Sequence, residues 1–345
     1  MDSNLLRFIV LFILIGHYLI DTLSDWLNLK ALKTQVPTEF ANVYPEPEYA
    51  RSQQYLKDTT WVAMIQSTVM LIFIIVAILF GWFNQLDLWL RESVSTPIIL
   101  GLLYFGVLSL IMTILGTPAR LYRTFVIEER YGFNTTTIKT FILDMIKGLI
   151  LTIVLGGLIA SLCLWVFETY TQLAWLYAWG LVTLIQLIMM YVAPVWIMPL
   201  FNKFSPIGNP QLKIAIEHFL EKEQFPCEGI YEMDGSKRSN KANAFFTGLG
   251  DKRRIVLFDT LIKDFSIPEI IGVLAHEIGH YKYKHILKQL VISTISTGVT
   301  FYLLGLFLNN PTLFEAFHMN NISVYGSFVF FSFLMSPILF LENIF

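Results

Sequence analysis

The stretch GVLAHEIGHYKYKH, residues 272–285, has the spacing of a metal-binding helix. His276 and His280 stand four residues apart, so on a helix both imidazoles project from one face, one turn apart. Two imidazoles placed in this way can bind one Zn²⁺ ion. Glu277 lies about 100° further round, where its carboxylate can reach a water on the metal without joining the same ligand set. We therefore predict that His276 and His280 are zinc ligands and that Glu277 is the general base of a hydrolytic site.

The residues around this stretch also favour a helix. Residues 266–269 read SIPE, a capping box with Pro in the first turn, so a helix is expected to start there. Gly279 keeps one side of the turn between the histidines small, which would let a substrate or another backbone come close. The alternative without a metal site is a pair of surface histidines at the start of a helix that enters a membrane.

The composition is that of a polytopic membrane protein. Of the 345 residues, 55% are hydrophobic and 14% are charged, whereas soluble domains are about 45–50% apolar and about 25% charged. The net charge of −2 provides no basic field, so nucleic-acid binding is not expected. Cys163 lies in an apolar run and Cys227 in a polar segment, which predicts neither a disulfide framework nor a Cys-based zinc site.

Seven apolar segments are long enough to span a bilayer, which takes about 20 mostly apolar residues. They are Leu5–Leu27, Trp61–Phe83, Thr96–Leu115, Ile138–Phe167, Leu173–Met198, Ile286–Leu308 and a last one that begins near Ile322 and is still apolar at Phe345. The first segment lacks a small-residue cleavage site, so we expect a retained helix rather than a signal peptide.

Between the fifth and sixth segments lies the only long polar block. Residues 199–210 (PLFNKFSPIGNP) read as a loop because of their Pro, Asn and Gly content. Residues 211–225 (QLKIAIEHFLEKEQF) have apolar side chains at helical spacing. Three short strands are expected in GIYEMDGS (229–236), NAFFTGLG (243–250) and RRIVLFDTL (253–261).

These segments predict a membrane all-α bundle of about seven transmembrane helices with an inserted α+β zinc metalloprotease module. Residues 1–198 would form five transmembrane helices with short loops. Residues 199–285 would form the module with the HExxH helix, and residues 286–345 the sixth and an incomplete seventh transmembrane helix. Lys and Arg are abundant in the loops after the first and third segments, which places the module in the cytoplasm.

Four stretches carry a resemblance that extends beyond the HExxH helix. They are VLAHEIGHYKYKH (273–285), EERYGFNTTTIKTFILDMIKG (128–148), PLFNKFSPI (199–207) and GSKRSNKANAFFTGLGDKRRIVLFDTLI (235–262). Together they resemble the CAAX prenyl protease 1 family, the Ste24-like integral-membrane zinc proteases of peptidase family M48. The order of five spanning segments, a polar block and at least one further span is also similar, so the resemblance covers essentially the whole chain.

The resemblance implies a hollow chamber in the bundle, faced by the zinc site, and a substrate that is the C-terminus of a prenylated protein. It also implies that the strand beginning at Asn243 and Ala244 binds the extended substrate backbone, with the Asn near the scissile bond. Strand addition suits a protease, because main-chain hydrogen bonds hold the peptide while pockets read alternate side chains. The alternative is an ordinary core strand.

The third zinc ligand departs from the family pattern. The family supplies it as the first Glu of an ExxAD motif after the seventh helix, and no ExxAD occurs in this chain. We expect this ligand beyond Phe345. Glu342 is the alternative, although a lone Glu in such a run can also be a buried polar partner. Glu315 is disfavoured, because it lies in the loop predicted on the far side.

Three other residues near the predicted site each have two possible roles. His285 could contact the substrate or orient a ligand, or it could cap the polar side of a membrane entry. Asp259 and Asp264 could orient a ligating imidazole, as carboxylates behind metal ligands often do. Either could equally be a turn or cap residue.

Polar residues also occur inside the predicted spans. His17 and Asp21 form a pair four residues apart, and Asp144, Lys147 and Gln186 lie in other spans. Ionisable residues at this depth are functional candidates by default. They show that the interior is not uniformly apolar, as a water-filled chamber would allow.

The predicted function is therefore that of an integral-membrane zinc metalloendopeptidase with one Zn²⁺, acting on prenylated or membrane-associated peptides or proteins in the lipid bilayer. The membrane would be the ER membrane in a eukaryote and the inner membrane in a bacterium. One alternative is a membrane-protein quality-control protease of HtpX-like or site-2 type. Another is a non-enzymatic membrane protein, either one that binds a metal or a transporter or scaffold with an incidental His pair.

Overall fold

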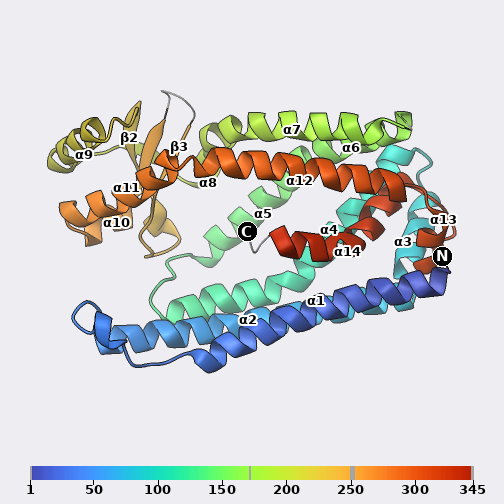
Figure 1. The fold of residues 1–345 in the computed structure, drawn as a ribbon, viewed down its shortest axis with the longest axis horizontal. Helices are drawn as coiled ribbons and strands as arrows, with labels where there is room; N and C mark the ends of the chain where they lie inside the picture. Colours follow the sequence, from blue (N-terminus) through green and yellow to red (C-terminus); the bar gives the residue numbers. More distant parts are fainter. Residues whose placement is uncertain (1, 171, 249–252, 343–345) are drawn as a thin grey trace. The chain divides into compact units, whose positions relative to one another are not determined.

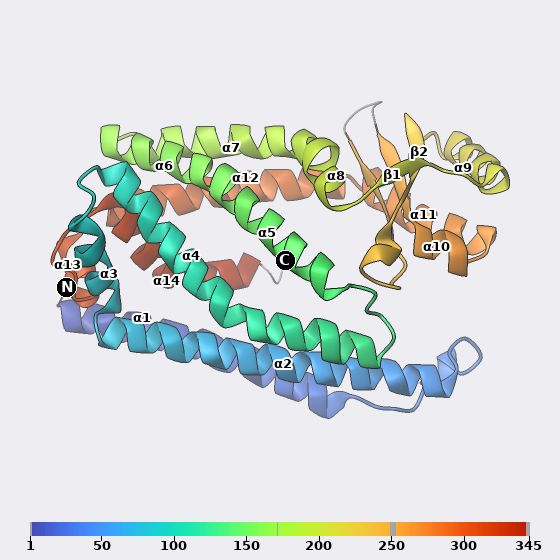
Figure 2. The same ribbon diagram turned by 180° about the vertical axis from the view of Figure 1, so that it is seen from behind.

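The structure, a computed structural model, describes residues 2–170, 172–248 and 253–342, except for the side chains of 337–342. Figures 1 and 2 show its helices and strands from two opposite sides. The chain divides into two compact units. The helical unit comprises residues 1–131, 151–178 and 299–345, and the sheet unit comprises residues 132–150 and 179–298.

In the described part of the chain, the helical unit is built from seven helices, of which the long ones are apolar and α3 and α13 are short. They are α1 (Ser3–Ala31), α2 (Glu46–Leu79), α3 (Trp82–Arg91), α4 (Pro97–Tyr122), α6 (Gly157–Thr169), α13 (Pro311–Ala316) and α14 (Val324–Glu342), with short helical turns at Thr38–Phe40, Arg123–Glu128 and Thr152–Gly156. Helices α1 and α2 lie side by side in both views, and α1 also contacts α13 and α14.

Aromatic rings and a small residue pack the core of the helical unit. Phe317 stacks on Phe330 with ring centroids 4.1 Å apart, and Phe83 meets Phe330 edge-on at 5.7 Å. Gly101 lets α4 approach its neighbours, because a Cβ atom there would lie 2.8 Å from Leu164 Cδ1 on α6. Small residues at helix crossings are a common means of close packing in membrane bundles.

The sheet unit combines helices with one mixed sheet. Its helices are α5 (Ile138–Leu151), α7 (Ala174–Val192), α8 (Met198–Phe201), α9 (Pro210–Lys222), α10 (Asp259–Asp264), α11 (Ile267–Lys282) and α12 (His285–Phe307), with helical turns at Ala193–Ile197 and Gly235–Lys237. Its strands are β1 (Phe204–Pro206), β2 (Gly229–Met233), β3 (Ala244–Thr247) and β4 (Arg254–Phe258), in the order β1-β2-β4-β3. Strands β2 and β4 are parallel, and both outer strands pair antiparallel.

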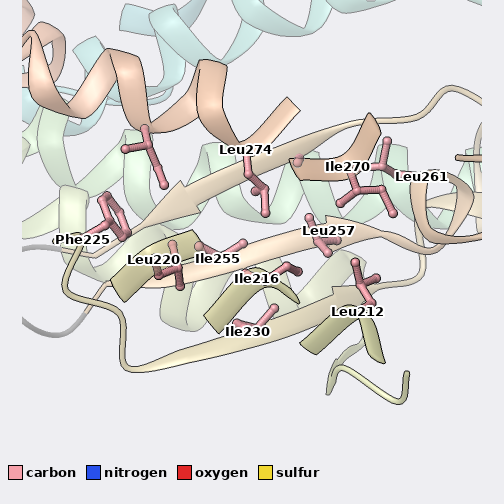
Figure 3. Close-up of a cluster of buried hydrophobic side chains, with 12 residues drawn as sticks. Leu212, Ile216, Leu220, Phe225, Ile230, Ile255, Leu257, Leu261, Ile270 and Leu274 are labelled. Atoms are coloured by element: carbon pink, nitrogen blue, oxygen red, sulfur yellow. The ribbon is translucent and has the colours of Figure 1, made fainter. Parts of the chain in front are cut away.

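One face of this sheet is covered by α9 and α11 (Figure 3). Strand β4 contributes Ile255 and Leu257 to that face, and the register places Ile230 of β2 and Ala244 of β3 beside them. The helices add residues four apart in sequence, namely Leu212, Ile216 and Leu220 from α9 and Ile270, Leu274 and Ile278 from α11. This apolar layer is the core that positions the HExxH helix.

The predicted elements agree with the structure in kind and differ at some boundaries. The helix at 211–225 and the three strands are present, as α9, β2, β3 and β4. Helix α2 begins at Glu46, well before the apolar run at Trp61. Its first turns are polar, so the apolar pattern that predicted the span did not include them. The predicted loop at 199–210 was partly wrong, since it contains α8 and β1.

Six helices among the described residues are long and apolar enough to cross a membrane. They overlap the first six predicted spans, in order along the chain, although the second span was predicted to run on to Phe83 and the helix ends at Leu79. Helix α14 corresponds to the seventh, and its apolar described stretch, Val324–Ser336, is shorter.

The polar residues inside these spans have protein partners. His17 Nε2 lies 3.2 Å from Asp21 Oδ2, and His17 Nδ1 lies 3.2 Å from Ser336 Oγ. In the sheet unit the pairs are Asp144 with Arg238, Lys147 with the Leu200 carbonyl, and Gln186 with Ser293. Each of these polar side chains therefore has a hydrogen-bond or ion-pair partner in the part of the chain that the structure describes.

Candidate metal centre

Helix α11 is fixed at its first residue by the predicted capping box. The Ser266 backbone N–H donates to Glu269 Oε2 at 2.8 Å, and the Ser266 hydroxyl donates to the same oxygen at 2.6 Å. These hydrogen bonds from the Ser266 side chain and backbone hold the pKa of Glu269 below its usual value. The cap therefore keeps its charged form at neutral pH and fixes where the helix starts.

The helix then turns its two histidines away from the core. Ile270, Leu274 and Ile278 are buried against the sheet, while His276 and His280 are exposed. Their Nε2 atoms lie 3.2 Å apart. Two ligands of a tetrahedral zinc ion, each at 2.0–2.1 Å, are separated by about 3.3 Å. The two nitrogens can thus direct their lone pairs at one cation, and the donor set fits zinc.

Glu277 and Gly279 leave the turn between the histidines open. The Glu277 carboxylate is half-buried and has no hydrogen-bond partner among the residues that the structure describes. A Cβ atom on Gly279 would meet no described atom within 4 Å apart from its chain neighbours and the backbone of its own helix. There is consequently room beside the histidines for a ligand, as the small residue predicts.

His285 lies beside this pair because the chain turns sharply after α11. Lys284 has a φ of 54°, in the left-handed region, and its N–H donates to the Tyr281 carbonyl at 2.8 Å. This turn brings His285, the first residue of α12, back to α11, where its Nδ1 lies 2.8 Å from His280 Nδ1. His280 faces His276 with Nε2 and contacts His285 with Nδ1. His285 therefore lies on the side of the His280 ring away from the predicted metal position.

An aromatic cluster holds the C-terminal turn of α11. Tyr281 meets Phe225 edge-on with ring centroids 5.0 Å apart and Phe246 at 6.3 Å, and the Arg253 guanidinium lies 4.2 Å from the Tyr281 ring centroid. Lys282 adds a salt bridge to Glu223, which lowers the pKa of that carboxyl group. The turn that carries His280 is therefore packed on both the strand side and the α9 side.

Strand β3 lies at the edge of the described sheet. It pairs with β4 through Ala244 and Leu257, and the carbonyl of Asn243 accepts from the Phe258 N–H at 3.0 Å. The other side of β3 pairs with no other described strand. A strand with a free edge can bind an extended peptide through its main chain.

Two of the stretches that carry the resemblance, residues 128–148 and 235–262, are joined by hydrogen bonds. Thr135 N–H and the Thr136 hydroxyl donate to the Arg238 carbonyl, at 3.3 and 2.9 Å, and Asn240 N–H donates to the Phe133 carbonyl at 2.9 Å. The Arg238 guanidinium binds both carboxylate oxygens of Asp144, at 2.7 and 2.9 Å.

The same guanidinium also donates to the Phe201 carbonyl at 2.8 Å. Sequence reasoning missed Arg238. The signal was Asp144, a carboxylate in an apolar helix, which needs a cationic partner.

The remaining candidate residues lie elsewhere. Asp259 accepts from Ser236 N–H and Thr260 N–H, at 2.8 and 2.9 Å, so it anchors a turn instead of an imidazole. Asp264 ends α10, and no hydrogen bond links it to a described imidazole. Among the described residues no group of three metal-binding side chains is present. The side chain of Glu342 and any ligand beyond Phe345 lie outside the described residues.

The chain matches two family models that follow one another along the sequence. The model described as CAAX prenyl protease N-terminal, five membrane helices, covers residues 25–203, and the model of peptidase family M48 covers residues 206–342. The chain belongs to peptidase family M48. Membership of this family implies a metal cofactor, which agrees with the fit of the histidine pair, and a multi-pass membrane protein.

The similarity to individual relatives covers different shares of their length. CAAX prenyl protease 1 of Saccharomyces cerevisiae is 39% identical over 69% of this chain and 53% of its own, and probable CAAX prenyl protease 1 of Schizosaccharomyces pombe is 35% identical over 83% and 63%. The chain thus spans about half to two thirds of the length of these two relatives. The homolog of Arabidopsis thaliana is 32% identical over 94% of this chain and 79% of its own.

The crystal structure of S. mikatae Ste24p has a TM-score of 0.90 and 30% identity, over 96% of this chain and 82% of that one. The predicted family and fold class, a helical membrane protein with an M48 module, are confirmed.

Proposed function

We propose that this M48 member is an integral-membrane zinc metalloendopeptidase that removes the C-terminal tripeptide of prenylated CAAX proteins. The observation that carries the proposal is the pair of Nε2 atoms, 3.2 Å apart, beside a carboxylate with no described partner. The shared name of its relatives, CAAX prenyl protease 1, supports the substrate class.

In this mechanism His276 and His280 are ligands through Nε2, and Glu277 moves the proton. Zinc, when bound, acidifies water and polarises a carbonyl group. Glu277 takes a proton from the attacking water and gives it to the leaving amine as the peptide bond breaks. No covalent bond forms between protein and substrate. Asn243 and Ala244 start the strand that aligns the peptide backbone.

A catalytic zinc site takes three protein ligands. We infer that the third is a carboxylate from beyond Phe345, with Glu342 as the alternative. Residues 199–285 act as the catalytic module on the cytoplasmic side, which the Lys and Arg pattern of the loops supports. The membrane is the ER membrane in a eukaryote or the inner membrane in a bacterium.

The proposal is tested with the purified full-length protein and a farnesylated peptide that ends in Cys-aliphatic-aliphatic-X. Release of the tripeptide is expected, with loss of activity on chelation and recovery when Zn²⁺ is added. The same peptide without the farnesyl group is the matched control. A protein that retains zinc but cuts neither peptide would sink the CAAX substrate. Cleavage of unfolded membrane proteins alone would indicate a quality-control protease.

His285 is expected to be a positioning residue for His280. With Nε2 of His280 on the metal, its Nδ1 carries the proton and donates to His285 Nδ1, 2.8 Å away. Losing such a partner typically lowers metal affinity by about 10- to 100-fold. We expect His285→Ala to show this loss in a chelator competition assay, and His285→Gln, which keeps an acceptor, to recover part of it. Equal zinc affinity of wild type and His285→Ala would refute the role.

A further inference from the structure

The sheet face opposite α9 and α11 borders a cavity of about 210 Å³. On this face Tyr231, Val256 and Phe245 form one row, because Tyr231 pairs with Val256 and Val256 pairs with Phe245. The opposite wall comes from the segment that ends the fifth span and includes Val195 and Met198. The cavity thus lies wholly within the sheet unit, on the far side of the sheet from the HExxH helix.

The walls of this cavity are mainly apolar, and its charged end is neutralised. Arg254 Nε lies 3.0 Å from Glu228 Oε2, and the Arg254 guanidinium lies 5.5 Å from the Tyr231 ring centroid. Because the two charges pair with each other, the cavity has no net charge to offer an ionic ligand. An apolar group suits it better.

The volume limits the size of that group. At about 30 Å³ for each water, the cavity holds about seven waters, and it is smaller than the 300–1,000 Å³ of pockets for drug-sized ligands. Seven heavy atoms is also the size of a phenylalanine side chain. The cavity therefore fits one large aliphatic or aromatic side chain.

Strand β3 connects this cavity to a bound peptide. Phe245 and Thr247 point to the cavity face and both line it, whereas Phe246 packs toward the α9 and α11 side. A peptide on the free edge of β3 places every second side chain on the cavity face, with Cβ atoms about 5 Å from those of the strand. The large Phe245 side chain occupies the space above its own position on β3. Thr247 is small, so the cavity beside it stays accessible from the edge of β3.

We propose that this cavity is a specificity subsite that takes one large aliphatic or aromatic side chain of the substrate, at the position opposite Thr247. The proposal rests on the proposed function, because it requires a peptide on the edge of β3. Residues directly before and after this position point to the other face of the sheet. Selectivity from the cavity is therefore confined to one substrate position.

The first test compares peptide series that carry Ala, Leu or Phe at each position in turn. Wild type should prefer Leu or Phe at one position by about 10- to 100-fold in kcat/KM, as expected for burying a large side chain. Thr247→Trp, which fills the cavity from the strand, should abolish this preference. Val195→Trp, which fills the cavity from the opposite wall, should also abolish the preference for Leu or Phe. Thr247→Val, of equal size, should keep the preference.

The second test does not depend on cleavage. In the Glu277→Gln protein, a cysteine at position 195 (Val195→Cys) should be protected from alkylation by the Leu peptide and not by the Ala peptide. Cleavage of no peptide by the wild type would count against the proposed function, and protection would still decide the subsite. A side-chain preference that survives both tryptophan variants, or no Leu-dependent protection, would overturn the subsite.

Discussion

Replacing Glu277 by glutamine is expected to lower kcat for peptide hydrolysis by about 10²- to 10⁴-fold, which is the usual contribution of a general base. Glutamine has the shape of glutamate but cannot accept the proton of the attacking water. The proposed zinc ligands His276 and His280 are unchanged and stay on the same helix face. The loss should therefore appear in kcat, measured with the farnesylated peptide, while the protein still binds one zinc ion.

A matched control separates this effect from a general loss of charge. Glu217 lies on α9 of the same unit, where its exposed carboxylate pairs with Lys213 at 3.7 Å. Glu217→Gln removes one negative charge from the surface and should leave kcat within about twofold, since exposed pairs contribute little. Zinc content is measured on each variant. A Glu277→Gln protein with full zinc and wild-type kcat would show that another group takes the proton.

The HExxH helix could be predicted in detail because its signals are local. The cap at Ser266 and Glu269 and the histidine spacing each depend on residues within one or two turns. The spans could be predicted because the bilayer is a uniform solvent that requires about 20 apolar residues in a row. Strand β1 could not, since three residues that include Pro206 become a strand only by pairing with β2, about 25 residues further along.

The contacts that hold the site together depend on distant pairs. His285 could be singled out, but its contact with His280 depends on the left-handed turn at Lys284, which no residue type there signals. Asp144 could be identified as a carboxylate that needs a partner, but nothing local points to Arg238, 94 positions away. Strand β3 could be predicted from its own residues, whereas the cavity beside Thr247 also needs the opposite wall, which includes Val195 and Met198.

Arg238→Met is expected to destabilise the sheet unit by about 2–4 kcal/mol, because it leaves Asp144 half-enclosed without its hydrogen-bonded cation. Arg238 and Asp144 are only 23% and 24% exposed, and their pair has two hydrogen bonds. The change also removes the bond to the Phe201 carbonyl at the end of α8. The apparent melting temperature in detergent should fall by about 5 °C or more.

The double variant distinguishes a lost ion pair from a lost side chain. Arg238→Met with Asp144→Asn should be more stable than Arg238→Met alone, because no half-enclosed carboxylate is left without its hydrogen-bonded partner. Arg254→Met is the matched control: it breaks the Arg254–Glu228 pair, which is 41% and 44% exposed, and should cost at most about 1 kcal/mol. If Arg238→Met were no more harmful than Arg254→Met, the anchoring role would be wrong. If it holds, the same variant should also weaken peptide binding, because Arg238 fixes the loop that leads into the edge strand β3.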